Sequence, residues 1–384
     1  MKKILGALSL LLAGLLAACG IGYSEARSVT LLAANVGKGD ALVLKVDDYA
    51  CLIDAGKPHA RGKVRAALQA LGVTALDAVF LTHTDNDHAG GLEWLAQDDI
   101  PVGAWYAPGM FTGVKKKKHP IVKAADERDQ SPKWLERGDT IPLGNTGAVL
   151  RVLAPATLFT DKDDNNSLVM MLETSQGRML LTGDMELPEE ADLLEYDDDL
   201  HCDVLKAPNH GDDDTLSEAF AEAVSAKVCV ISTDSAEKPD TPDPGVLARL
   251  TAVGTKCYVT QDATLGVRVT LNGGNPEVTY LNIEAPMSQA ITVQASDADS
   301  DLVTLYNPGP DCDMTGWYLY SDRGDELYAF PAGTVFPAGQ TLTLGSHKSP
   351  RGYDLLWDVK RIHHKSKEDH ILLYDPYGRC VDRL

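Results

Sequence analysis

The sequence predicts an α/β domain over residues 28–284, followed by a small all-β sandwich over residues 290–384. In the first region, short β-rich runs alternate with segments whose apolar residues have helical spacing. In the second region, short strand patterns are separated by Pro- and Gly-rich turns at 307–310, 330–333 and 336–339. Such regularly punctuated strands without helices are typical of a β-sandwich. A chain of 384 residues is long enough for both domains.

The elements of the first region follow from local patterns. A helix is expected at 63–71, ended by Gly72, and further helices are expected at 216–224 and 244–253. Strands are expected wherever apolar residues alternate or run continuously: at 29–34, 41–46, 50–54, 78–81, 149–154, 168–173, 179–182, 228–232, 256–260, 266–271 and 277–283. By itself this alternation indicates only an α/β architecture.

The region after the α/β domain begins with a segment, 285–289, that lacks periodicity and is predicted to be a linker. In the β-sandwich that follows, Trp317 and Trp357 are interpreted as core aromatic residues, with carbohydrate stacking as the alternative. The sequence does not identify a ligand for this domain.

The N-terminus has the features of an export signal. Lys2 and Lys3 precede an apolar segment that is too short to span a membrane comfortably and that ends Leu-Ala-Ala-Cys, similar to a bacterial lipobox. We therefore expect a signal peptide at 1–18, lipidation of Cys19, and a tether at 19–27 that holds the exported protein on the outer face of a membrane. A plain secretory signal or an uncleaved anchor is the alternative.

The charge of the chain limits its partners. A formal net charge of −21 disfavours a protein that coats nucleic acid, because phosphate contacts require Lys and Arg. The charge does not exclude a hydrolase, since divalent ions reverse the sign of the local field. Two basic runs, at 115–118 and 360–367, either contact a phosphate backbone or are solvated loops.

The cysteines do not form a zinc ribbon, because the sequence has no CxxC pair. Cys312 and Cys380 are a candidate disulfide in the C-terminal domain if the protein is exported. Cys51, Cys229 and Cys257 lie in apolar runs and are expected to be buried thiols, while a metal role for Cys202, beside His201, stays open.

The most informative local feature is a loop that holds four potential metal ligands. His83, Asp85, Asp87 and His88 follow the apolar run 78–81 and precede a Gly-Gly pair. His and Asp bind divalent metals, and four in one loop exceed what one tetrahedral ion takes from one segment. Two adjacent ions are therefore expected, and a solvated acidic turn is the alternative.

The loop and five other segments, in the same order along the chain, resemble the metallo-β-lactamase superfamily. The similarity is to the metallo-hydrolase domain of ComEC-type DNA-uptake proteins, and it covers about residues 28–284. The matching segments are 35–41 (NVGKGDA), 52–56 (LIDAG), 83–88 (HTDNDH), 165–169 (NNSLV), 180–184 (LLTGD) and 203–211 (DVLKAPNHG). The chain departs from that pattern at Asn35, Asn209 and Asp212. The resemblance implies an αββα sandwich.

The C-terminal region has a resemblance of its own. Residues 302–309, 314–319, 336–344 and 369–375 together resemble a lamin-tail domain, which is an immunoglobulin-like module. In exported bacterial enzymes, such modules look like accessory binding or positioning units.

The superfamily resemblance also implies roles for individual residues. His83 and Asp85 would hold one ion, and Asp87, His88 and His210 the other, with Asp184 bridging the two. The remaining ligand that the family provides for the first ion has no obvious equivalent in this chain. Asn166 stands where the ComEC-type proteins have an Asn. Oxygen-rich ligation favours Mn²⁺, with Zn²⁺ possible. Behind the metals, the residues expected to orient the ligands are Asp40, Asp54 and Asn166. The residues expected to act in catalysis are Asp87, Asp184 and Lys206. A surface position for Lys206 is the alternative.

These observations favour an exported, lipid-anchored, metal-dependent phosphodiester hydrolase, a nuclease acting on extracellular DNA. The acidic run Asp212–Asp214 keeps a second hypothesis open, namely a metallo-hydrolase of a small phosphoester or acyl ester. A non-catalytic surface binding protein is the third. Besides the substrate, the expected partner is the membrane, through Cys19.

Overall fold

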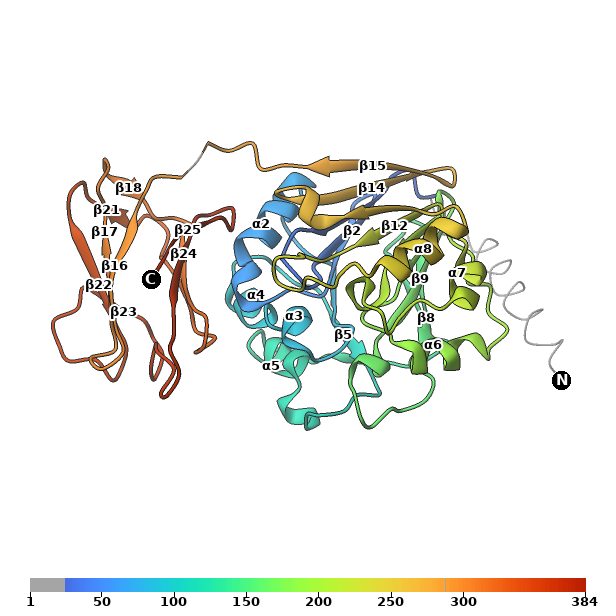
Figure 1. Cartoon of the computed structure of the whole chain (residues 1–384), viewed down its shortest axis with the longest axis horizontal. Coiled ribbons are helices and arrows are strands. Elements are labelled where there is room, and N and C mark those ends of the chain that lie inside the picture. The colour runs from blue at the N-terminus through green and yellow to red at the C-terminus, as the bar shows by residue number, and fades with distance from the viewer. Residues whose placement is uncertain (1–24, 287) are drawn as a thin grey trace.

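The computed structural model describes residues 25–286 and 288–384. The predicted signal peptide and lipidation at Cys19 lie outside the described residues. Figure 1 shows a larger domain joined to a smaller C-terminal domain; we use these names for residues 29–281 and 292–383. None of the helices in the described part of the chain is long and apolar enough to cross a bilayer.

The larger domain is built on two mixed β-sheets. Within the described residues, the first sheet has the order β15 (Asn275–Leu281), β14 (Gly266–Asn272), β1 (Val29–Ala34), β2 (Leu42–Val46), β3 (Tyr49–Ile53), β4 (Ala78–Phe80), β5 (Trp105–Pro108) and β6 (Lys133–Leu135). The second has the order β13 (Lys256–Val259), β12 (Val228–Ile231), β11 (Val204–Lys206), β10 (Gly177–Leu181), β9 (Val169–Thr174), β8 (Val149–Ala154) and β7 (Thr140–Pro142).

The two sheets pack face to face and helices cover their outer faces. Leu31 and Leu44 of the first sheet meet Leu150 and Met170 of the second in one buried cluster. Figure 1 shows α2 (Arg61–Ala70), α4 (Leu92–Gln97) and α5 (Pro120–Asp126) on one side of the strands. On the other side lie α6 (Leu187–Leu194), α7 (Glu218–Val224) and α8 (Pro244–Ala252). The predicted αββα sandwich is confirmed.

Local sequence explains where some helices begin and end. Asp243 accepts hydrogen bonds from the backbone N–H groups of Gly245 and Val246, and Pro244 occupies the first turn, so α8 begins with both standard signals. The helix α2 ends at Ala70, and Gly72 follows with a φ of +62°, a backbone conformation that favours glycine.

Parallel strand pairs bring the predicted site residues to one edge. β3, β4 and β5 are parallel neighbours, and so are β10, β11 and β12. The loops that follow β3, β4, β10 and β11 carry Asp54, the His83–His88 segment, Asp184 and His210. The carboxyl ends of parallel strands meet at the same edge of a sheet, which is where ligands bind in open α/β folds.

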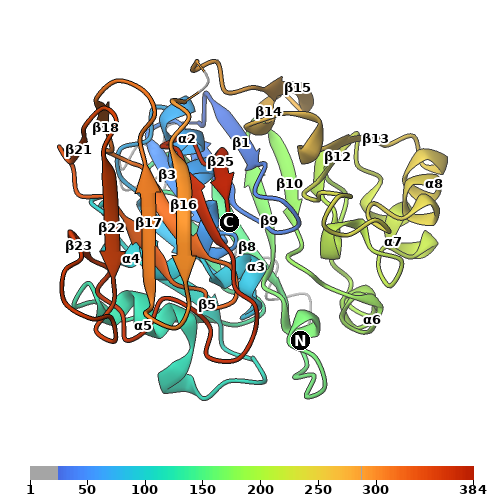
Figure 2. The same ribbon diagram turned by 60° about the vertical axis from the view of Figure 1, so that its left-hand side comes forward.

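The C-terminal domain is a β-sandwich, as predicted. One sheet has the order β16 (Thr292–Asp297), β17 (Leu302–Tyr306), β22 (Thr341–Gly345), β23 (Leu355–Leu356), and Figure 2 shows β16, β17 and β22 side by side. The other has the order β20 (Leu327–Ala329), β19 (Tyr318–Ser321), β24 (Ile371–Tyr374), β25 (Cys380–Arg383). A short pair, β18 (Cys312–Asp313) and β21 (Val335–Phe336), completes it. Trp317 and Trp357 are buried in its core.

The cysteines in the described residues are free. Cys312 lies in β18 and Cys380 in β25, on different sheets, so the candidate disulfide between them is not formed. Cys51 and Cys229 are buried and Cys257 is partly buried. The thiol of Cys202 donates to the carbonyl of Val204 and belongs to none of the groups of potential metal ligands in the described chain.

The two domains contact each other at the short helix Pro58–Ala60 and the start of α2. The backbone N–H of Gly62 donates to the Tyr318 hydroxyl at 3.3 Å, and that hydroxyl donates to the carbonyl of His59 at 2.7 Å. The His59 ring packs against Tyr320 and Tyr374, with centroids 5.0 and 5.8 Å away. His59 belongs to the short helix Pro58–Ala60, four residues after the strand end that carries Asp54.

Candidate metal centre

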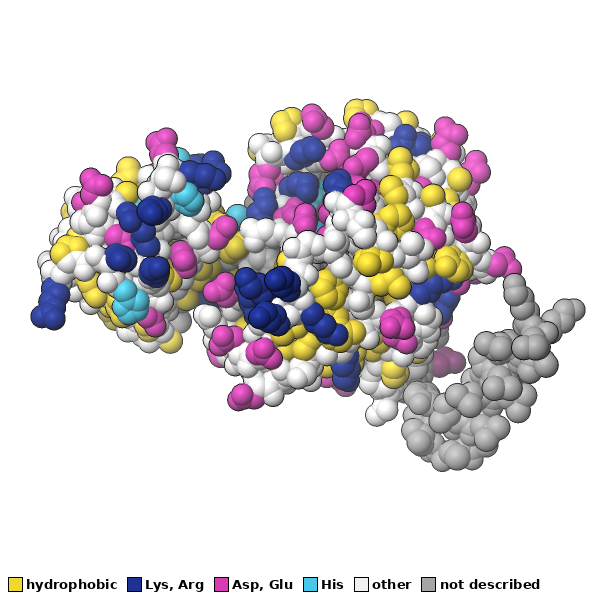
Figure 3. All heavy atoms as spheres, turned by 90° about the horizontal axis from the view of Figure 1, so that it is seen from below, with side chains coloured by type: hydrophobic (Ala, Val, Ile, Leu, Met, Phe, Trp, Pro, Cys, Tyr) yellow, Lys and Arg dark blue, Asp and Glu magenta, His cyan; other side chains and the backbone are white. Residues whose placement is uncertain are grey.

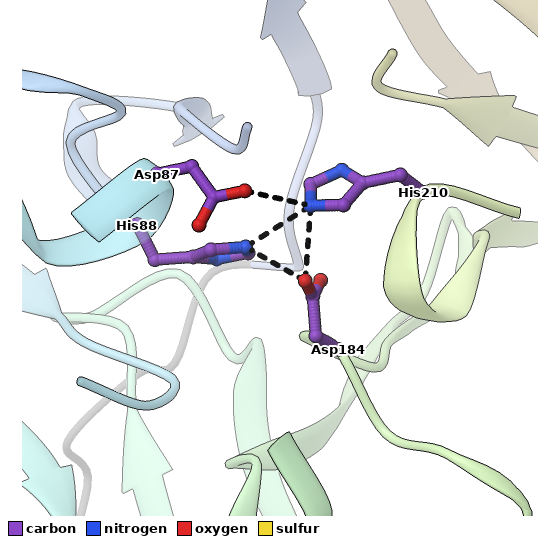
Figure 4. A group of neighbouring side chains, drawn as sticks. All are labelled: Asp87, His88, Asp184 and His210. Carbon is purple, nitrogen blue, oxygen red and sulfur yellow. Dashed lines mark hydrogen bonds and ion pairs between the residues drawn. The ribbon is translucent and has the colours of Figure 1, made fainter. Parts of the chain in front are cut away.

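Four side chains from three loops converge in what we call the buried ligand group. Asp87 and His88 come from α3 (Asn86–Ala89), Asp184 from the turn after β10, and His210 from the short helix Pro208–Gly211. The Oδ2 atom of Asp184 lies 3.1 Å from Nε2 of His88 and 2.9 Å from Nε2 of His210. Figure 4 shows all four side chains pointing toward one space.

Hydrogen bonds on the far side of each imidazole define which nitrogen faces this space. Nδ1 of His210 lies 2.7 Å from the carbonyl of Ser232, which only accepts, so this nitrogen carries a proton. Nδ1 of His88 lies 2.7 Å from the Asp54 carboxylate, which fixes the same tautomer. In the neutral rings, both Nε2 lone pairs therefore face each other across 3.3 Å. Two acceptors cannot hydrogen-bond to each other, so the arrangement fits a cation between them.

Burial and charge tune the same side chains. Burial disfavours the protonated forms of His88 and His210, but the carboxylates of Asp184 and its neighbours outweigh burial and raise both pKa values. Burial acts in the opposite sense on Asp184, and the two histidines with Lys206 outweigh it, so the pKa of Asp184 is well below its usual value. In the protein without metal, protons on the histidines balance the carboxylates.

A second set of ligands, the outer ligand group, adjoins the first. It consists of His83, Asp85 and Asp164, and the rings of His83 and His88 lie 4.2 Å apart. Nε2 of His83 is buried, forms no hydrogen bond among the described residues, and lies 3.5 Å from Oδ1 of Asp164. Such an unpartnered buried nitrogen, beside two carboxylates, fits a metal ligand.

Asp164 is a potential ligand that the sequence prediction did not include. It directly precedes the segment 165–169 that was matched to the family pattern, so the signal was present one residue upstream. Asn166, predicted to stand behind the metals, instead orders this loop. Its amide group accepts from the N–H of Phe159 at 2.9 Å and donates to the carbonyls of Phe159 and Lys162. It therefore acts on the segment that carries Asp164, and the structure gives it no direct contact with a histidine ligand.

Asp54 links both ligand groups. Besides its contact with His88, its carboxylate accepts from the N–H and the hydroxyl of Thr82, both at 2.8 Å. Because the Thr82 hydroxyl donates to Asp54, it accepts from Nδ1 of His83 at 3.1 Å. Asp54 has a φ of +59° and His210 a φ of +56°. Left-handed backbone at such residues costs about 1–3 kcal/mol and persists where the surroundings demand it, commonly at functional sites.

Lys206 does not occupy the position predicted for it. Its side chain has 0% exposure, and its ammonium lies 2.5 Å from Asp40 and 3.5 Å from Asp184. It also donates to the carbonyl of Gly183 at 3.0 Å. A group so enclosed cannot contact a substrate phosphate, and it is equally not a surface lysine. Lys206 is a positioning residue, which together with Asp40 supports Asp184 from behind.

Lys38 is a cation at the open side of the site that the sequence prediction did not single out. Its ammonium lies 2.8 Å from Oδ2 of Asp87, and its side chain is 25% exposed. Burial lowers its pKa, but Asp87 and Asp184 outweigh burial and raise it, so the group is charged. Gly37 and Gly39 flank it with φ values of +81° and +156°. A Cβ at Gly39 would lie 2.6 Å from the carbonyl oxygen of Asp87, so only glycine permits this close approach.

The acidic run 212–214 is partly neutralised. Asp212 forms an ion pair with Lys238 at 2.8 Å, and this contact outweighs the effect of partial burial to lower the pKa of Asp212. Asp214 accepts a hydrogen bond from the side-chain amide of Asn209 at 3.2 Å. Asp213 is exposed. Two of the three carboxylates are thus already engaged.

The residues present fit two divalent ions. The buried ligand group offers two imidazole nitrogens and two carboxylates, and the outer group offers one imidazole nitrogen and two carboxylates. All six predicted ligands belong to one group or the other: His83, Asp85, Asp87, His88, Asp184 and His210.

Comparison with known families assigns both domains. The Metallo-beta-lactamase superfamily matches residues 34–233, just over half of the chain, and the Lamin Tail Domain matches residues 285–384. The chain belongs to the metallo-β-lactamase superfamily, whose members are typically metal-dependent hydrolases that bind two divalent ions. Both predicted resemblances are confirmed.

Bacterial competence proteins are among the relatives of this chain. ComE operon protein 3 of Bacillus subtilis (strain 168) is 30% identical over 183 residues, which are 48% of this chain and 23% of that protein. Competence protein ComA of Neisseria gonorrhoeae is 28% identical over 226 residues, 58% of this chain and 29% of that protein. The chain spans less than a third of the length of these curated relatives.

Solved structures with a similar arrangement include the metallo-beta-lactamase fold protein YhfI from Bacillus subtilis. It is 11% identical with a TM-score of 0.39, over 61% of this chain and 96% of that one. A diphosphatase from the PhnP family is 16% identical, also with a TM-score of 0.39, over 64% of this chain and 98% of that one.

Proposed function

We propose that the protein is an exported, membrane-anchored phosphodiester hydrolase that uses two divalent ions and acts as a nuclease on extracellular DNA. The observation that carries the proposal is the adjacency of the two ligand groups, whose His83 and His88 rings are 4.2 Å apart. Adjacent divalent ions, when bound, lower the pKa of water and neutralise the charge of a phosphodiester on both of its reacting sides.

The protein's own residues would prepare this site for an anionic substrate. Asp54 and Ser232 hold the imidazoles of His88 and His210 in one tautomer, so that both rings present lone pairs. Asp184 stays ionised because the histidines and Lys206 surround it. Lys38 lies at the open side of the site, where its ammonium contacts Asp87. When substrate binds, this ammonium would leave Asp87 and bind a phosphate oxygen instead.

The choice of metal follows from the donor atoms. Carboxylates contribute four of the seven potential ligands in the two groups. Oxygen donors favour Mn²⁺ or Mg²⁺ over Zn²⁺, whereas the general order of affinities favours Zn²⁺. We propose Mn²⁺ as the ion used, with Zn²⁺ as the alternative.

Export and anchoring rest on the N-terminal sequence. The basic residues Lys2 and Lys3, the apolar segment after them and the lipobox-like end at Cys19 support a lipid anchor on the outer face of a membrane. One relative is named a competence protein, which supports a nucleic-acid substrate. A small phosphoester is the second candidate, favoured by the exposed carboxylate of Asp213 near the site.

The proposal is tested by cleavage of labelled single- and double-stranded DNA. Metal-stripped protein would be compared with protein given Mn²⁺, Mg²⁺ or Zn²⁺, and Asp184→Ala would serve as the inactive variant. Mn²⁺-dependent cleavage that this variant lacks is expected. Metal binding without cleavage of any DNA would contradict the nuclease proposal and favour a small phosphoester or an acyl ester. Absence of metal binding would favour a surface binding protein.

A further inference from the structure

One exposed basic segment of the larger domain stands out in a chain with a net charge of −21. Lys115, Lys116, Lys117 and Lys118 are consecutive and all exposed. Figure 3 shows Lys and Arg side chains gathered on this domain in the view from below. We call residues 115–118 the lysine loop. Four adjacent ammonium groups on one turn create a local positive potential, which attracts an anionic partner.

The lysine loop has a defined shape. Lys116–Lys118 form one turn of 3₁₀-helix, in which the N–H of Lys118 donates to the carbonyl of Lys115 at 2.7 Å. The next residue, His119, is buried between Phe111 and Trp134, with ring centroids 4.6 and 5.2 Å away. Burial lowers the pKa of His119 to about 4, so the ring is a neutral aromatic support. The lysines therefore project from a packed base.

The segment that leads into the lysine loop is hydrogen-bonded, through Asp163, to the loop that runs from His83 to His88. One carboxylate oxygen of Asp163 accepts from the N–H of Thr112 at 2.6 Å. The other accepts from the N–H and the hydroxyl of Thr84, at 3.0 and 2.6 Å. Thr84 stands between the ligands His83 and Asp85, and Asp163 directly precedes the ligand Asp164. Thr112, three residues before the lysine loop, is thus linked to the outer ligand group through a single side chain, that of Asp163.

Chain length limits how far the lysines lie from Thr112. Lys115 follows Thr112 by three residues, which span at most about 10 Å when extended. One strand of nucleic acid advances about 3.4 Å per nucleotide along a helix axis. A strand with a phosphate at the metal centre would therefore reach the lysine loop within a few nucleotides.

We propose that the lysine loop binds the phosphates of a single-stranded nucleic acid that enters the metal centre, which makes it a substrate-binding surface; this rests on the proposed function. Single strands are favoured because the histidine ligands are buried. A single strand is narrower and more flexible than a duplex, whose persistence length is about 150 base pairs, so a single strand reaches buried ligands more easily. Trp134 supports the lysine loop from below, since Lys116 lies 4.5 Å from the centre of its ring and Phe111 stacks on that ring with centroids 5.4 Å apart.

The proposal is tested by binding, so that it does not depend on cleavage. Purified full-length protein in detergent would be titrated, with EDTA present, into a fluorescent single-stranded 12-nucleotide oligonucleotide. In the test variant, Lys115, Lys116, Lys117 and Lys118 are each replaced by Gln. The matched control replaces four exposed basic residues of the C-terminal domain that lie outside the run 360–367 by Gln, and so changes the charge equally: Arg323, Lys348, Arg351 and Arg383. A third variant, with Arg at 115–118, keeps the charge.

We expect the Kd of the Gln variant of the lysine loop to rise at least about ten-fold, and the slope of log K against log salt to fall by about 3, as for four phosphates on a single strand. The Arg variant should bind like the wild type, and the control should change less than about two-fold. Equal losses in the loop variant and the control, or no loss in the loop variant, would overturn the proposal. Unfolding temperatures identify a variant that fails to fold, and the Arg variant then decides.

Two further outcomes separate this proposal from others. Loop-dependent binding to vesicles of phosphatidylglycerol and phosphatidylcholine, without binding to the oligonucleotide, would assign the lysine loop to a membrane surface and overturn the proposal. Loop-dependent oligonucleotide binding in a protein that cleaves no DNA would uphold the lysine loop and contradict the nuclease function. DNA cleavage and oligonucleotide binding that do not depend on the lysine loop would uphold the nuclease function and contradict the role of the lysine loop.

Discussion

The two ligand groups of the metal centre differ in how firmly the protein holds them. In the buried ligand group, His88 and His210 are each oriented by a hydrogen bond at 2.7 Å and are fully buried. In the outer ligand group, Asp85 is exposed, and Asp164 comes from a loop that Asn166 orders mainly through backbone contacts. The outer ligand group also has a larger share of oxygen donors. We infer that the buried group binds its ion first and that the outer group sets the preference for Mn²⁺.

Removing Asp184 should have the largest effect, because its carboxylate lies within 3.1 Å of both histidines of the buried ligand group. We expect Asp184→Ala to lower kcat for a phosphodiester by more than about 100-fold, since losing even a hydrogen-bond partner of a ligand costs about 10–100-fold. Glu222→Ala, which removes an exposed carboxylate of α7, is the matched control. Comparable activity in the two variants would contradict the assignment of Asp184.

Removing Asp164 should separate the two groups. Asp164→Ala takes a carboxylate from the outer ligand group and leaves the buried ligand group intact. The bound metal, measured by mass spectrometry after dialysis, should fall from two ions to one, and kcat should fall about 10–100-fold. Asp161→Ala, an exposed carboxylate on the same loop, should retain both ions. Two ions retained after dialysis of the Asp164 variant would show that the outer ligand group binds its ion without Asp164.

Altering Asp54 probes the support behind the buried ligand group. Asp54→Asn keeps the size of the side chain but weakens its acceptance from Nδ1 of His88. We expect the affinity for the tighter ion to fall about 10–100-fold, measured by competition with a chelating dye. Asp47→Asn, at an exposed turn where the carboxylate accepts from Ser28, is the control. An unchanged affinity would mean that His88 is oriented without Asp54.

Lys38 tests the open side of the site. Lys38→Ala should raise the KM for a phosphodiester about ten-fold, because a hydrogen bond between charged groups is worth about 1.5–3 kcal/mol. Lys38→Arg should restore most of the loss. A change confined to kcat, with an unchanged KM, would instead assign Lys38 to the orientation of Asp87.

The pH dependence of the metal-free protein should be the smallest effect. His88 and His210 have raised pKa values in the folded state. Their protonation therefore stabilises the fold below about pH 6.5, the pKa of a histidine in the unfolded chain, and this stabilisation is lost as the pH rises through the pKa values of the folded state. The unfolding temperature of EDTA-treated protein should therefore fall between pH 7 and 8.5. With Mn²⁺ it should rise over the same range, because metal displaces these protons. A rise without metal would contradict the charge balance described here.

Sequence patterns predicted the strands more completely than the helices. The sandwich strands and α2, α7 and α8 were predicted within a few residues. A helix was also expected after Gly90-Gly91, where α4 lies. The helices α5 and α6 were not predicted, because their short lengths leave little periodic signal and their stability comes from packing on a sheet. The short strands β5, β6 and β7 were missed for the same reason.

Local sequence by itself determined which chemistry this chain carries. The loop from His83 to His88 gathers four potential ligands within six residues, and the resemblance to the metallo-β-lactamase superfamily added Asp184 and His210. Tertiary structure decided the rest, because His88 and His210 are 122 residues apart and meet only when the two sheets pack. The enclosure of Lys206, the position of Lys38 and the recruitment of Asp164 depend on that packing, since a residue's exposure and partners are properties of the fold.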